Sequence, residues 1–225
     1  MFTLKTSQPS VMVFAFFSTI YVGIRYLHPF DFDWLIKIVP LCLLVFLWTT
    51  QPAASRKPVL LAALLFSLGG DILLSQKGLF LAGLGSFLIA QLSYAWLFSQ
   101  QIAWQTGRMP LLIGLLIYLG TVAIYVVPHT GQLAVAIIAY MCAITTMVAL
   151  AFLRQAPHWQ WVALGAALFL ISDSLIAVSK FTGALVGYEA ITGALIMATY
   201  YGAQGLIVFG YLAQSSEPKS MVYTS

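Results

Sequence analysis

The chain has 225 residues, of which 61% are hydrophobic and 7% are charged, and its mean hydropathy is +0.96. This composition excludes an ordinary soluble globular protein and predicts an integral membrane protein. The net charge of +4 comes from lysines and arginines in predicted loops. We therefore interpret it as a sign of membrane topology and do not expect nucleic-acid binding.

Apolar stretches of membrane-spanning length follow one another along the whole chain. A spanning helix needs about 20 mostly apolar residues. Eight stretches between charged or Pro/Gly-containing breaks are candidates: 9–27, 34–50, 58–76, 79–101, 109–127, 131–153, 159–179 and 188–212. Runs such as VLLAALLF are apolar on all sides and lack the alternation of barrel strands. We predict an all-α polytopic membrane protein in which residues 1–225 form a single bundle of eight transmembrane helices.

Asp71 and Asp173 are the exceptions to this apolar pattern, because the interiors of the stretches carry no other Asp, Glu, Lys or Arg. An ionised group inside a bilayer is costly, so an intramembrane carboxylate is typical of a functional site. The two lie in LFSLGGDILLS and LFLISDSLIAVS, four predicted helices apart and at matching depths. This offset suggests a parallel repeat of helices 1–4 and 5–8, although leucine-rich helices also match by chance.

Other polar residues gather near the predicted level of the aspartates. Ser67 shares a helix face with Asp71, and Gly69 and Gly70 would let a backbone or a substrate approach closely. The candidate substrate-binding residues are Arg25, Lys37, Ser67, Gln91, Tyr94, Ser172, Lys180, Tyr200 and Gln204. Each also has a structural interpretation, since serines bond their own backbone, Tyr and Gln link helices, and Lys and Arg reach toward the membrane surface.

Several familiar chemistries lack their residues in this sequence. The three histidines lie in or beside predicted loops, so we predict no metal site and no cofactor. A G-x-S-x-G motif is missing, and no histidine lies deep enough to serve a serine beside either aspartate. Carboxylate chemistry remains. Burial favours a protonated carboxyl, and two nearby carboxyls share one charge, so an acid and a base can coexist.

Five motifs in order resemble the lysoplasmalogenase family of YhhN-type membrane proteins. They are KIVPL, LFSLGGDILL, FLAGLGSFLIAQLSYAW, LFLISDSLIAV and IMATYYGAQGLIV. One position departs from the family pattern, because many members have histidine where this chain has Gln91. An amide can still form hydrogen bonds at this position, but it does not transfer protons as histidine does. The resemblance implies an eight-helix hydrolase that cleaves the vinyl ether bond of lysoplasmalogens taken from the bilayer. Its products would be a fatty aldehyde and a glycerophospho-ethanolamine or -choline.

Vinyl ether hydrolysis suits a pair of carboxyls. It begins with protonation of the β-carbon and passes through an oxocarbenium ion, so it needs a strong, desolvated acid. We expect one aspartate to deliver the proton and the other to stabilise the cation and activate water. We favour Asp71 as the acid because its neighbours in the sequence are less polar. Lys37, with Arg25 or Lys180, is expected to hold the substrate phosphate.

Two alternatives and a topology complete the sequence-based expectations. Paired intramembrane carboxylates also serve proton- or cation-coupled transporters, and a lipid-binding scaffold is a further possibility. With eight spans both ends of the chain share a side that carries six of the ten Lys and Arg residues. Both termini are therefore expected in the cytoplasm. We expect a multi-pass protein of the cell membrane, such as a bacterial inner membrane, or of the endoplasmic reticulum in a eukaryote.

Overall fold

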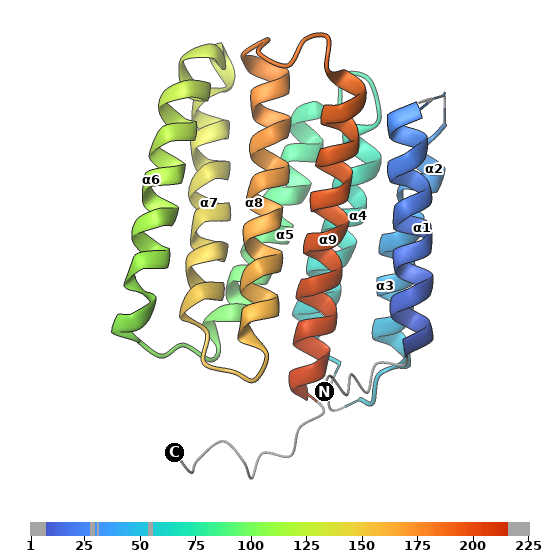
Figure 1. Cartoon of the computed structure of the whole chain (residues 1–225), viewed down its shortest axis with the longest axis vertical. Coiled ribbons are helices and arrows are strands. Elements are labelled where there is room, and N and C mark those ends of the chain that lie inside the picture. The colour runs from blue at the N-terminus through green and yellow to red at the C-terminus, as the bar shows by residue number, and fades with distance from the viewer. Residues whose placement is uncertain (1–7, 28–29, 31, 54–55, 216–225) are drawn as a thin grey trace.

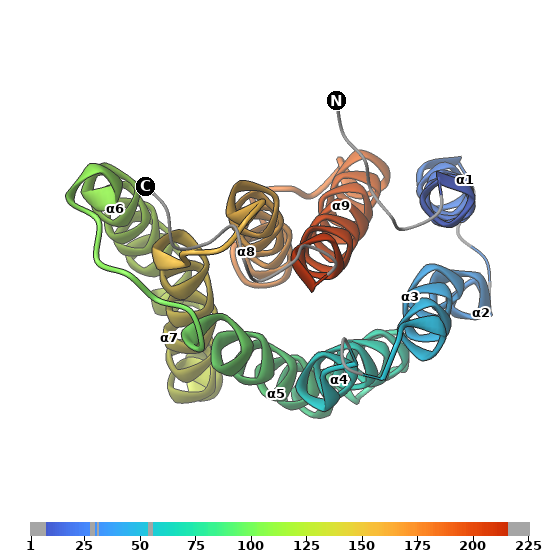
Figure 2. The same cartoon turned by 90° about the horizontal axis from the view of Figure 1, so that it is seen from below.

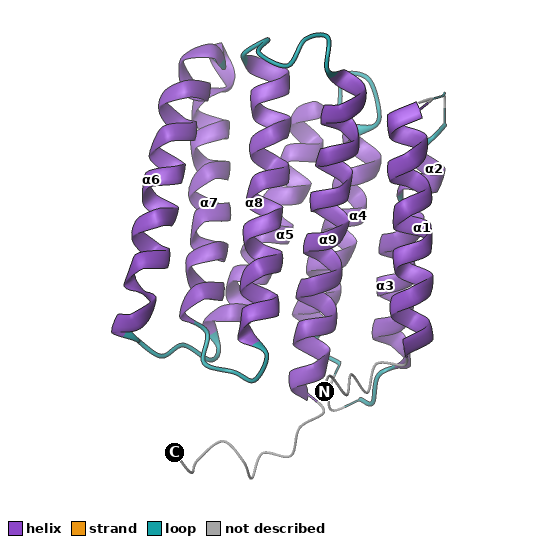
Figure 3. Cartoon of the chain, in the orientation of Figure 1, coloured by secondary structure: helices purple, strands orange, loops and turns teal. Residues whose placement is uncertain are grey.

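The fold is known from a computed structural model that describes residues 8–27, 30, 32–53 and 56–215. This part of the chain is helical and contains no β-strand (Figure 3). The helices are α1 (Gln8–Leu27), α2 (Trp34–Lys37), α3 (Val39–Thr50), α4 (Pro58–Leu74), α5 (Phe80–Ser99), α6 (Met109–Val126), α7 (Ala134–Leu153), α8 (Trp159–Phe181) and α9 (Glu189–Ser215). Within the described residues, six helices are long and apolar enough to cross a membrane. The predicted all-α polytopic membrane protein is thereby confirmed.

The second predicted stretch is divided, which the apolar pattern alone did not show. Helix α2 ends at Lys37 and α3 begins at Val39. Pro40 explains the break, because proline has no N–H to bond the carbonyl of Ile36 and its ring crowds that carbonyl. The interruption falls where Lys37 enters the interior.

The long helices run side by side along one axis of the molecule (Figure 1). Seen from one end, α6, α7, α5, α4 and α3 follow an arc, and α8, α9 and α1 lie along its concave side (Figure 2). Helix α1 begins and α9 ends at the same end of the molecule, the lower one in Figure 1. The loop between α4 and α5 and the loop between α8 and α9 lie at the opposite, upper end.

Two helix pairs approach closely through glycine. A Cβ atom at Gly70 of α4 would lie 2.5 Å from the ring of Phe87 on α5. A Cβ at Gly165 of α8 would lie 2.8 Å from the backbone oxygen of Ala203 on α9. Small residues permit such packing between membrane helices. The close neighbour of Gly70 is thus an aromatic side chain and not the backbone or substrate that the sequence led us to expect. The close pairing of α8 with α9 was not predicted.

Candidate active site

Asp71 lies near the C-terminal end of α4 and is only 2% exposed. Its carboxylate forms an ion pair with Lys37, with 3.1 Å between Oδ1 and Nζ. The Tyr200 hydroxyl donates a hydrogen bond of 2.8 Å to Oδ2. Both oxygens therefore have partners, and the ammonium group compensates the charge that burial would otherwise disfavour.

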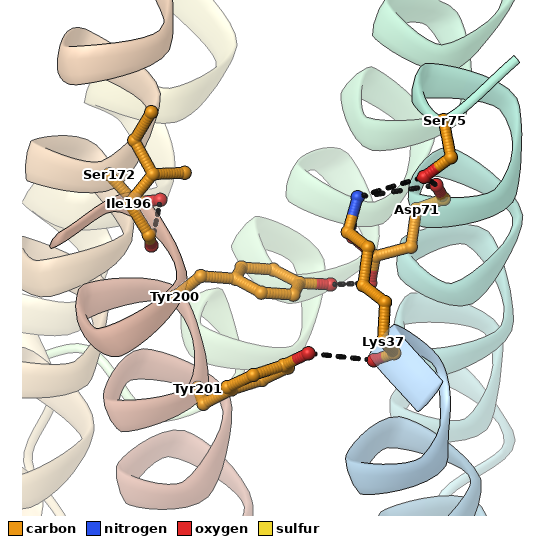
Figure 4. Close-up of polar contacts among 7 residues, drawn as sticks. All are labelled: Lys37, Asp71, Ser75, Ser172, Ile196, Tyr200 and Tyr201. Carbon is orange, nitrogen blue, oxygen red and sulfur yellow. Dashed lines mark hydrogen bonds and ion pairs between the residues drawn. The ribbon is translucent and has the colours of Figure 1, made fainter. Parts of the chain in front are cut away.

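Hydrogen bonds to its backbone carbonyl and from its ammonium group hold Lys37 in place. The Tyr201 hydroxyl donates to the Lys37 carbonyl at 2.7 Å, and Lys37 Nζ also lies 3.3 Å from the Asp71 carbonyl oxygen. In Figure 4, Tyr200 and Tyr201 reach from α9 toward Asp71 and Lys37. Two consecutive tyrosines of α9 thus fix both members of the ion pair.

Asp173 of α8 has different surroundings. Its Oδ2 accepts hydrogen bonds from the Tyr140 hydroxyl at 2.5 Å and from Gln91 Nε2 at 2.9 Å. Among the residues that the structure describes, no lysine, arginine or histidine pairs with this carboxyl. The two predicted catalytic residues thus differ in their partners: Asp71 has a cationic one and Asp173 has neutral ones, and of the two only Asp173 lines one of the pockets described below.

A polar pocket of about 440 Å³ opens at the upper end of the molecule. Three cationic side chains line it, from Arg25 of α1, Lys37 of α2 and Lys180 of α8, together with Asp33. The Lys180 ammonium also lies 4.2 Å from the centre of the Phe80 ring. The three cations that the sequence analysis proposed for the substrate phosphate thus line one pocket, and such a cluster suits an anionic group.

A second, narrower pocket of about 60 Å³ lies between α5, α6, α7 and α8. Asp173, Ser174, Tyr140 and Tyr118 are the polar residues of a lining that is otherwise apolar. Leu74, Phe80 and Ile176 line this apolar pocket and also line the polar pocket. The two pockets are thus neighbours, and together they match the two ends of an amphiphile.

The remaining predicted residues support the site without lining either pocket. Gln91 is fully buried behind Asp173 and holds its carboxyl. The Tyr94 hydroxyl donates to Gln204 Oε1 at 2.6 Å, which links α5 to α9. Ser172 donates to the Ile196 carbonyl, which links α8 to α9 (Figure 4). Ser67 is fully buried one turn before Asp71. Gln91, Tyr94, Gln204 and Ser172 therefore act as links between helices, whereas the Ser67 hydroxyl has no hydrogen-bond partner among the described residues.

Tyr140 and Tyr201 belong to the site and were not predicted. Tyr140 was identifiable as a lone hydroxyl within the apolar run LAVAIIAYMCAI, where a buried tyrosine needs a partner. Tyr201 adjoins Tyr200, but its partner is the backbone carbonyl of Lys37, at the end of α2. No sequence pattern signals that contact.

Comparisons with known proteins identify a family and several named relatives. Residues 32–211 match the model of the YhhN family. The lysoplasmalogenase of Mycobacterium bovis is 31% identical over 72% of this chain, and the match spans 63% of that relative's length. Human lysoplasmalogenase TMEM86B is 32% identical over 83% of this chain and 77% of its own. Human lysoplasmalogenase TMEM86A is 34% identical over 82% and 79%. No solved structure matches the chain.

Proposed function

The chain belongs to the YhhN family, and we propose that it is a membrane-embedded hydrolase of lysoplasmalogens. It would cleave the vinyl ether bond and release a fatty aldehyde and a glycerophospho-ethanolamine or -choline. The observation that carries this proposal is a carboxyl group, Asp173, in an apolar pocket that adjoins a cationic one. The names of the relatives favour hydrolysis over the transporter and scaffold alternatives.

The polar pocket is proposed as the site of the phosphate head group. Arg25 and Lys180 line it and form no ion pair with another residue in the described part of the chain. Lys37 is already paired with Asp71, so we assign it mainly to holding that carboxylate. Arginine suits a phosphate because its planar donors bind two oxygens at once.

Asp173 is proposed as the acid, which reverses the assignment that the sequence favoured. The ammonium of Lys37 stabilises Asp71 as a carboxylate, whereas Asp173 has an uncharged hydroxyl and amide beside it. A carboxyl in apolar surroundings without a cation is more easily kept protonated. In addition, the carbon to be protonated lies on the hydrocarbon side of the ether oxygen, and Asp173 lines the apolar pocket.

The reaction can be written with every proton assigned. Asp173 gives its proton to the β-carbon of the vinyl ether, and the remaining oxocarbenium ion is stabilised by the Asp71 carboxylate. Water adds to this cation and gives a proton to Asp71, which forms a hemiacetal. The hemiacetal hydroxyl then returns a proton to Asp173 while Asp71 protonates the departing glycerol oxygen. The carbon–oxygen bond breaks, aldehyde and alcohol leave, and both carboxyls regain their starting states.

The proposed arrangement in the membrane adds two spans to the six long helices. We infer that the two shorter apolar segments, Trp34–Thr50 and Pro58–Leu74, also cross the bilayer, which makes eight spans in one domain. The ends of α1 and α9 that share one side (Figure 1) then face the cytoplasm of a cell membrane, following the Lys and Arg bias. Lysolipid would reach the site from the bilayer without an aqueous channel.

A turnover assay on the purified protein in detergent tests the proposed function. A lysoplasmalogen should yield free aldehyde, whereas the saturated alkyl ether of the same head group and chain should yield none, because it has no double bond to protonate. Activity that requires sealed vesicles and an ion gradient would instead support the transporter. Lipid binding without any product would support the scaffold.

A further inference from the structure

The apolar pocket has four helical walls, and the residues of one wall show its extent. On α8 its lining runs from Leu170 to Phe181, which is about 16 Å at 1.5 Å per residue. Asp173 lies one turn from the deep end of this row. A polar ligand would find few partners along such a lining, so the occupant must be largely hydrocarbon.

The pocket begins where the polar pocket ends. Leu74, Phe80 and Ile176 are common to both, and they lie between the cationic cluster and Asp173. An anionic lysolipid can therefore place its phosphate beside Arg25 and Lys180 and its glycerol unit between these three side chains. Its vinyl ether bond would then lie near Asp173, which lines the apolar pocket.

Helix α6 forms the far wall of the apolar pocket through Tyr118, Leu119 and Val122. This helix is loosely held: of its residues, all of which the structure describes, Leu115 and Val126 are buried. Its outer face is exposed, with Ile124 at 79%. Helix α6 is thus the wall that separates the apolar pocket from the outer face of the molecule.

We propose that the pocket between α5, α6, α7 and α8 binds the hydrocarbon chain of the lysolipid, and that Val122 of α6 contacts this chain beyond the reacting bond. The inference rests on the proposed function for the identity of the head group and the reacting bond. It adds the place of the chain and a residue that sets chain-length preference.

A bulky side chain at Val122 tests the chain site. In purified Val122→Trp, kcat/KM for a long-chain lysoplasmalogen should fall by about tenfold or more, because the indole fills space in a pocket of only about 60 Å³ and leaves too little room for the chain. A short-chain substrate that does not reach Val122 should be cleaved almost as by the wild type. Ile124→Trp, on the exposed face of the same helix, is the matched control and should cleave both substrates normally. Equal rates for both substrates in Val122→Trp, or an equal loss for both, would overturn the proposal.

A second measurement needs neither turnover nor a variant. A non-cleavable alkyl-ether lysophospholipid with a photoreactive diazirine in its chain should label Val122, Leu119 or Ile144 of the wild-type protein, and unlabelled lysolipid should suppress this labelling. Labels confined to the outer face, at Ile117 and Ile124, would overturn the chain site even if the protein releases aldehyde. Labelling of the pocket without aldehyde release would support the chain site and contradict the proposed function.

Discussion

Asp71 and Asp173 have the same side chain and different neighbours, and this difference assigns their proposed roles. An ammonium lies 3.1 Å from Asp71, whereas Asp173 accepts bonds from a phenol and an amide. Replacing Asp173 with Asn removes the proton donor, so kcat should fall by about 100- to 10,000-fold, while the helical circular dichroism is retained. Glu189→Gln, which alters an exposed carboxylate, is the control. A comparable loss in that control would contradict the specific role of Asp173.

The ion pair between Lys37 and Asp71 leads to a separate prediction about stability. Lys37→Met leaves a buried carboxylate without its partner, which costs about 3–5 kcal/mol in measured cases, and kcat should fall as well. Denaturation of the detergent-solubilised protein measures the first effect. Adding Asp71→Asn to this variant should restore much of the stability and none of the activity. A higher KM with unchanged kcat and stability would mean that Lys37 only binds substrate.

Substitutions can distinguish the cationic side chains that line the polar pocket from a lysine elsewhere on the surface. Arg25→Ala and Lys180→Ala should each raise KM about tenfold and leave kcat nearly unchanged, because a charge-assisted hydrogen bond to phosphate contributes about 1.5–3 kcal/mol when formed. Lys77→Ala is the control, since Lys77 is exposed in the loop after α4 and lies outside the pocket. With an alkenylglycerol that lacks phosphate, all three variants should have the same KM as the wild type. Persistence of the defect there would contradict the phosphate assignment.

At the scale of elements, the close contact of α8 with α9 carries the site, because α8 holds Asp173 and α9 holds Tyr200. A methyl group at Gly165 would meet backbone atoms of α9, which cannot turn aside as a flexible side chain can. Gly165→Ala should therefore lower the free energy of unfolding by about 1–3 kcal/mol. Gly114→Ala on α6, where a Cβ meets nothing within 4 Å, should be neutral or stabilising. Equal thermal unfolding of the two variants would show that this packing is not tight.

At the scale of the whole molecule, the sequence predicted the helices well because each had to be apolar over a membrane's thickness. It also identified both carboxyls and the cations of the polar pocket, since polar groups are conspicuous in apolar stretches. It missed the break at Ile38, the partner of Asp173 on α7, and the bond from Ser172 to the backbone of α9. Those depend on which helix faces which, and helices that are apolar on all sides do not encode their neighbours by periodicity. The parallel repeat stays a prediction.

Hydrolysis of a lysoplasmalogen in D₂O tests the central claim most directly. Protonation of the β-carbon by Asp173 should place one deuterium on the carbon next to the carbonyl of the released aldehyde, which mass spectrometry detects. The Asp173→Asn variant should release almost no labelled aldehyde under the same conditions. Aldehyde without deuterium from the wild-type protein, or labelled aldehyde at an undiminished rate from Asp173→Asn, would contradict acid catalysis by this residue.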